Sequence, residues 1–187
     1  MRQILFAVFS AVCGENPEHV WAPGGEALPC CERCTGLYAG ALAAIVLRLW
    51  LRPRASGQSL RIHGLFLLQL GLFVFPWMPQ GAVLRTISGG LFGFGVVAFL
   101  WPAVCAWLPA ARVTTFGGMA YAMGLAGCLG LTPAIAEWGG KAGAFVLTGL
   151  VLAGAVALAA LAGANVARCL IELLAIILDK KRPEFSQ

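Results

Sequence analysis

Residues 142–165 form an uncharged run of the chain and read AGAFVLTGLVLAGAVALAALAGAN. A helix over these residues would be about 36 Å long at ~1.5 Å of rise per residue, which exceeds the ~30 Å hydrocarbon core of a bilayer. The run is apolar on all sides, whereas buried helices of water-soluble proteins are usually shorter and amphipathic. We therefore expect it to span a membrane.

Four further runs share this character. Three of them lie between successive charged residues, and one is interrupted only by Arg48, whose long stem is expected to carry its charge to the membrane surface. The whole chain fits, because 60% of its residues are hydrophobic and only 11% are charged. We predict an all-α, polytopic transmembrane helix bundle with a short N-terminal apolar helix over residues 3–12 and five spans, at 35–51, 62–78, 86–107, 113–136 and 142–165.

The two ends of the chain need a separate interpretation. Residues 3–12 are too few to cross a bilayer alone, and no small-x-small cleavage site follows them, so we interpret them as an uncleaved helix. Residues 169–178 either continue the last span or form a separate helix on the membrane surface. Without internal repeats, residues 1–187 are expected to form a single transmembrane domain.

Basic residues divide unequally between the two expected membrane faces. Arg33, Arg85 and Lys141 fall on one face, and the other ten of the 13 Lys and Arg residues fall on the opposite face. Because cytoplasmic loops are enriched in Lys and Arg, we expect both termini and the tail 179–187 in the cytoplasm of a prokaryote, with the loop 13–34 exterior to its inner membrane. This asymmetry accounts for the net charge of +5, so nucleic-acid binding is not expected.

Four of the seven cysteines bracket the exterior loop, and three chemistries are open for them. A disulfide from Cys13 to a later cysteine would fasten two segments together in an oxidising compartment. A set of Cys13, His19, Cys31 and Cys34 would suit a metal, with zinc as the expected cofactor. The third chemistry is a redox pair formed by Cys31 and Cys34. A thiolate there would be stabilised by Arg33 and by the N-terminus of the following helix.

Other residues around the loop are candidates for binding or packing. Arg33 and Arg85 are expected at the exterior face, where they would contact Glu18, Glu32 or anionic head groups. His63 is expected at the opposite membrane boundary rather than as a ligand. Small residues four positions apart let helices approach closely, so helix packing is expected at Gly36, Gly40, Gly89 and Gly93.

Catalytic signatures are scarce in this sequence. It shows no Ser-His-Asp set, no phosphate-binding loop and no carboxylate pair within the spans. We therefore expect a non-catalytic subunit or scaffold, with the lipid bilayer and other membrane subunits as partners, for example in a respiratory or photosynthetic complex. The alternative is a small membrane protein that handles thiols or a metal at the exterior face.

The loop also resembles a known family. Cys13-Gly14 and the segment Leu28-Pro29-Cys30-Cys31-Glu32-Arg33-Cys34-Thr35-Gly36-Leu37-Tyr38-Ala39-Gly40 are similar to the Cys-His-Gln and Leu-Pro-x-Cys-x-Arg-Cys-Thr-Gly-x-Tyr-x-Gly signature of a domain-of-unknown-function family of prokaryotic multi-pass membrane proteins. A weaker similarity includes Arg85 and Gly89, and the resemblance extends over about residues 13–109. It implies that Cys13, Cys31 and Cys34 carry the motif cysteines and that Cys30 is additional, but it names no reaction.

The orientation can be tested by cysteine labelling in a cysteine-free background. Gly24→Cys should react with a membrane-impermeant maleimide in intact cells, because residue 24 is expected outside. Ser56→Cys should react only after permeabilisation. Labelling of position 56 in intact cells would reverse the orientation.

Overall fold

The structure is a computed structural model that describes residues 7, 9, 13, 17–51, 57–72, 80–105 and 117–180. All regular secondary structure in these residues is helical, which confirms the all-α prediction. Two short 3-10 turns, η1 (Pro17–His19) and η2 (Pro23–Gly25), precede the long helices. These are α2 (Glu32–Leu51), α3 (Gly57–Leu72), α4 (Ala82–Cys105), α5 (Gly117–Trp138) and α6 (Gly140–Lys180).

Four of the long helices are long and apolar enough to cross a membrane, namely α2, α4, α5 and α6. They contain all of the predicted spans 35–51 and 142–165 and most of 86–107 and 113–136. The predicted span 62–78 falls on α3, which has 16 residues, and residues 73–79 lie outside the described residues. The count of five spans is therefore not confirmed.

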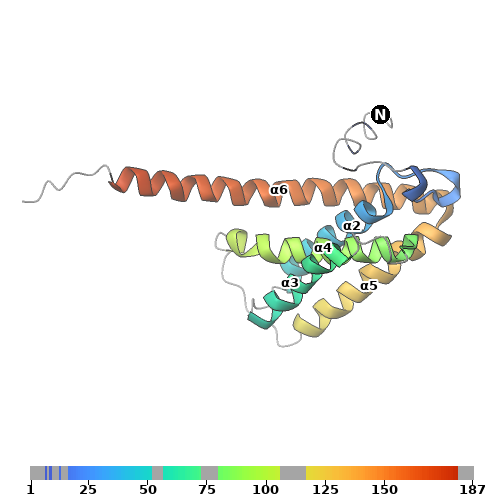
Figure 1. Cartoon of the computed structure of the whole chain (residues 1–187), viewed down its shortest axis with the longest axis horizontal. Helices are drawn as coiled ribbons and strands as arrows, with labels where there is room; N and C mark the ends of the chain where they lie inside the picture. Colours follow the sequence, from blue (N-terminus) through green and yellow to red (C-terminus); the bar gives the residue numbers. More distant parts are fainter. Residues whose placement is uncertain are drawn as a thin grey trace, which may run out of the picture.

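Helix α6 settles the interpretation of residues 169–178, which continue the preceding span without a break. It has 41 residues, so at ~1.5 Å per residue it is about 60 Å long, roughly twice the hydrocarbon core. In Figure 1 it runs alongside the other helices and projects past the end of α4. Of the N-terminal helix expected over residues 3–12, only positions 7 and 9 are described, and both are helical. Tail residues 181–187 lie outside the described residues.

Helices α2 and α4 pack against each other with almost no space between their backbones. A Cβ atom added at Gly40 would lie 2.5 Å from the carbonyl oxygen of Gly90, where real Cβ atoms are essentially never found. Added Cβ atoms at three other glycines, Gly36, Gly89 and Gly93, would likewise collide with backbone carbonyl oxygens of the opposite helix. Only glycine permits this approach, which places the backbones of α2 and α4 in direct contact.

The other helices surround this pair. The main core joins Ala41 and Ala44 of α2 to Phe94 and Val97 of α4, and Tyr121 of α5 and Leu161 of α6 close it on two sides. Helix α6 also contacts α2 directly, because a Cβ at Gly154 would collide with the carbonyl oxygen of Tyr38. The molecule is therefore a bundle built on a central helix pair (Figure 1).

Two polar side chains in the bundle are buried. Arg48 was expected to extend to the membrane surface, but it is only 5% exposed and lies among the helices. His63 is 4% exposed, and its position at the membrane boundary stays a prediction. The expectation for Arg48 was wrong because the side chain packs inward against the ring of Tyr121, with 5.4 Å between the guanidinium carbon and the ring centroid.

Alanine substitution can test the glycine contact. Gly93→Ala should lower the free energy of unfolding by about 1–3 kcal/mol, because an overpacked interface must separate or distort. Gly127→Ala in α5 is a matched control, since an added Cβ there meets nothing within 4 Å. It should be neutral or stabilising by up to about 1 kcal/mol through helix propensity. Equal unfolding midpoints for both variants in detergent would contradict the close contact.

Candidate metal centre

The cysteine cluster forms where α2 begins. Its first turn is closed by the Thr35 amide, which donates a hydrogen bond to the carbonyl oxygen of Cys31 at 2.9 Å. The Thr35 hydroxyl donates to the same oxygen at 3.1 Å. Residues three positions apart lie on the same side of a helical turn, so this turn brings Cys31 and Cys34 together.

Cys13 joins them from a distant part of the chain. Its amide donates to the Phe9 carbonyl oxygen at 2.7 Å, and its sulfur accepts a hydrogen bond from the Cys31 amide at 3.4 Å. Phe9 packs edge-on against Tyr38 of α2, with ring centroids 5.6 Å apart. These contacts fasten the segment before the loop to the segment after it, which the sequence analysis expected of a disulfide or a metal.

The sulfurs of Cys13, Cys31 and Cys34 all lie within 4.8 Å of one another. A metal ion with thiolate bonds of ~2.3 Å in tetrahedral geometry needs sulfurs about 3.8 Å apart, so a small contraction of this triangle would suffice. All three cysteines are free thiols in the structure. The arrangement is therefore a preformed three-sulfur site.

The remaining candidate ligand, His19, and the additional cysteine, Cys30, do not join this triangle. His19 lies in η1, and its ring nitrogens are not among the ligand atoms gathered within 4.8 Å. Cys30 is 1% exposed, and its sulfur lies 3.4 Å from the Thr35 hydroxyl. Among the described residues, the site thus offers three sulfur ligands and leaves a fourth coordination position open, as metal sites that exchange a ligand do.

The thiols in and beside this triangle differ in acidity. The pKa of Cys31 is lowered to about 5, chiefly because the Cys34 thiol donates a hydrogen bond to its sulfur. Burial raises the pKa of Cys13, and it raises that of Cys30 to about 12. At neutral pH the negative charge of the cluster is therefore held at Cys31, and a metal ion would displace the protons that remain.

A polar network joins the start of α2 to the start of α4 beside the cysteines. Arg85 and Glu32 form an ion pair at 3.1 Å, and Glu32 is 6% exposed. The Thr86 hydroxyl accepts a hydrogen bond from the Trp21 indole at 2.8 Å and lies 3.2 Å from the Glu32 carbonyl oxygen. Because a buried carboxylate without its partner is costly, this pair holds the first turn of α2 in register with α4.

Arg33 and Arg85 thus differ in their surroundings. Arg85 is paired with Glu32, one of the two glutamates considered from the sequence. Arg33 donates to the side-chain oxygen of Gln80 at 2.9 Å, and its Nε atom is buried without an acceptor in the described structure. Contact of Arg33 or Arg85 with a lipid head group stays a prediction.

The loop itself is anchored on the far side of the site. Leu28 is buried against Ala136, Ala144 and Leu147 of α5 and α6. Gly24, at φ +61°, sits so close to the start of α6 that an added Cβ would lie 2.5 Å from the Lys141 amide nitrogen. Helix α6 therefore begins directly beneath the loop, and the cysteines approach one another on a supported backbone.

The motif cysteines and their supporting residues fall in one segment that matches a known family. Residues 13–99 match the family described as "Predicted membrane protein (DUF2085)". This confirms the resemblance found in the sequence, although the match ends ten residues before the expected limit at 109. The DUF2085 segment contains all three clustered cysteines and the Arg85–Glu32 pair.

A distant relative matches about half of the chain. The chain is 26% identical over 109 residues to an uncharacterized protein, MJ1492, of Methanocaldococcus jannaschii, and this covers 52% of the chain and 67% of the relative. No solved structure matches the chain. The comparisons therefore support a membrane protein whose residues 13–99 are similar to the DUF2085 family, and they give no reaction.

Proposed function

We propose that this membrane protein binds one thiophilic metal ion, Zn²⁺ or Cu⁺, through Cys13, Cys31 and Cys34 at the exterior membrane face. The observation that carries the proposal is the approach of three sulfurs within 4.8 Å from two segments 18 residues apart. Thiolate ligands favour these two ions over harder divalent cations. The low pKa of Cys31 favours the proposal further, since a ligand must be a thiolate to bind.

The open fourth position decides between two uses of such a site. A structural zinc site is usually closed by four protein ligands, whereas a site with three leaves room for water or an exchanging ligand. With His19 outside the triangle, the geometry favours an ion that can be accepted or released. We therefore favour metal handling at the exterior face over a purely structural staple.

Metal binding can be measured on the purified, reduced protein in detergent. We expect one equivalent of Zn²⁺ or Cu⁺ per chain by elemental analysis, with three thiols protected from titration. At a free metal concentration 100 times Kd, binding should stabilise the fold by about 2.7 kcal/mol. Cys31→Ser and Cys34→Ser should abolish both effects, because each leaves only two sulfur ligands.

Two controls separate this proposal from its alternatives. Cys30→Ala and Cys169→Ser should retain the metal, because Cys30 faces Thr35 and Cys169 lies exposed on α6. A disulfide between any two cluster cysteines in protein isolated with blocked thiols would instead favour the fastening or redox role. Binding that survives Cys31→Ser would remove the metal proposal.

A subunit role is the second candidate, and α6 supplies its observation. The final third of this helix is apolar yet largely exposed, at Val166, Leu170, Ile171, Leu173, Leu174, Ile176 and Ile177. A groove of about 440 Å³ adjoins it, lined by Phe99 and Pro102 of α4 and by Asn165, Arg168, Cys169 and Glu172 of α6. An exposed apolar face of this kind marks contact with lipid or with another protein, and the adjoining groove favours a protein. We infer that an apolar helix of another membrane subunit packs there.

This second candidate has its own test. Ile171→Glu, placed at the exposed face, should reduce co-purification of the associated subunit in mild detergent, since a buried charge disfavours the contact. Glu137→Gln at the other end of the bundle is the control, because it changes a charge at an exposed residue far along the chain from α6's final third. A single chain of the same mass before and after Ile171→Glu would indicate that lipid covers this face.

A further inference from the structure

A second polar cluster lies inside the bundle at the opposite end from the cysteines, and the proposed metal site does not involve it. It comprises Arg48 of α2, His63 of α3 and Tyr121 of α5, each less than 10% exposed. Arg48 lies three residues before the end of α2, and His63 and Tyr121 are the seventh and fifth residues of their helices. At ~1.5 Å of rise per residue, each of the three lies within about 10 Å of an end of its helix.

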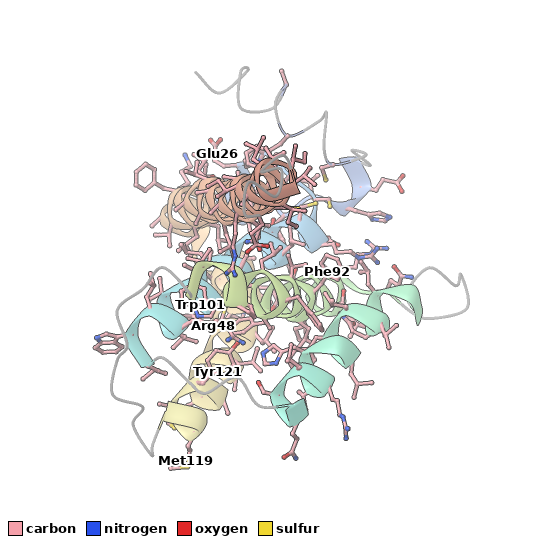
Figure 2. The ribbon with its side chains drawn as sticks, turned by 90° about the vertical axis from the view of Figure 1, so that its left-hand side faces the viewer. Glu26, Arg48, Phe92, Trp101, Met119 and Tyr121 are labelled. Carbon is pink, nitrogen blue, oxygen red and sulfur yellow. The ribbon has the colours of Figure 1, made fainter. Side chains whose placement is uncertain are left out.

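The charge of Arg48 has no counter-charge among the described residues. Its guanidinium lies over the Tyr121 ring, and Figure 2 shows these two side chains together within the bundle. The described ion pairs join Arg85 to Glu32 and Arg168 to Glu172, and neither includes Arg48. Interaction with an aromatic face compensates only part of the cost of burying a cation. The site therefore holds an excess positive charge.

The Nε atom of Arg48 adds a directional requirement. It is buried and has no hydrogen-bond acceptor in the described structure. A buried donor without an acceptor costs about 1–3 kcal/mol, and more when the group is charged. An acceptor that also carries negative charge would satisfy both the donor and the excess charge.

His63 and Tyr121 supply adjustable polar atoms beside the guanidinium. The Ser59 carbonyl oxygen can only accept, so His63 Nδ1, at 2.7 Å, carries the proton and donates to it. In a neutral imidazole, Nε2 then accepts a hydrogen bond from the Tyr121 hydroxyl at 3.0 Å. The Tyr121 oxygen also interacts with the Arg48 side chain, and its hydroxyl can turn toward another acceptor.

We propose that Arg48, assisted by Tyr121 and His63, binds the oxyanion of a phosphate group at this end of the bundle. A guanidinium presents paired N–H donors that match two phosphate oxygens, and it stays charged at any physiological pH. Phosphate is also present at membrane boundaries, in the head groups of phospholipids. Both an anionic lipid and free inorganic phosphate provide this chemistry, and the experiment distinguishes them.

The test uses the full-length protein with two probes. In detergent, sodium phosphate is titrated calorimetrically against a sodium chloride blank of equal ionic strength. In nanodiscs, the unfolding midpoint is compared between phosphatidylglycerol and phosphatidylcholine, and native mass spectrometry records retained lipid. Phosphate binding in detergent identifies the free anion. Stabilisation and lipid retention specific to phosphatidylglycerol identify the head group.

Variants connect either signal to Arg48. Arg48→Gln should abolish the signal, and Arg48→Lys should weaken it on the order of tenfold, because lysine keeps the charge but not the paired donors. Arg48→Lys also keeps the test valid if Arg48→Gln does not fold. Arg61→Gln should bind as the wild type does, because Arg61 is exposed on α3 two residues from His63. Neither signal in the wild type, or equal signals in the wild type and Arg48→Lys, would overturn the proposal.

Discussion

The contact between the glycines of α2 and α4 is the constraint on which the rest of the structure depends. At Gly36, Gly40, Gly89 and Gly93 the two backbones approach so closely that no larger side chain fits. This contact fixes where the first turn of α2 lies relative to the first turn of α4, and those two turns carry Cys34, Glu32 and Arg85. The geometry of the cysteine site thus follows from packing within the membrane, because the helix ends cannot shift without separating the backbones.

Charge is balanced differently at the two ends of this helix pair. Near the cysteines, Arg85 is neutralised by Glu32, and Arg33 has a hydrogen bond to Gln80. At the other end, Arg48 lies over the Tyr121 ring and has no carboxylate partner among the described residues. The two ends therefore differ in that an arginine–carboxylate ion pair is described only at the cysteine end.

The sequence predicted the architecture well where a single physical variable controls it. Span length and the scarcity of charge sufficed for α2, α4, α5 and α6, since crossing a bilayer requires about 20 apolar residues, whereas the fifth span is not confirmed. The sequence also named Cys13, Cys31 and Cys34 together with His19 as candidate ligands, and the structure brings the three sulfurs together without the histidine. The four-residue glycine spacing indicated a packing face but not its partner, because spacing on one helix carries no information about which helix lies opposite.

Residues whose environment depends on tertiary packing were less predictable. Arg48 and His63 were interpreted from their positions near span ends, where an exposed side chain is the common outcome. Their burial depends on Tyr121, which lies 58 residues from His63 along the chain and approaches only when α3 and α5 both pack on the central pair. One signal in the sequence could have indicated the burial of Arg48. Three apolar residues, Leu49, Trp50 and Leu51, follow it in the same predicted span, so Arg48 does not stand at the end of that span.

The position of His19, near the cysteines, was also not predictable from the sequence, because it too depends on tertiary packing. From ligand chemistry alone, a histidine between Cys13 and Cys31 belongs in a four-ligand zinc site, yet η1 holds it outside the sulfur triangle. The difference arises because Leu28 and Gly24 fasten the loop to α5 and α6, which fixes the path of the backbone between the cysteines. Anchoring of the loop therefore decides how many candidate ligands lie together, which are three sulfurs among the described residues.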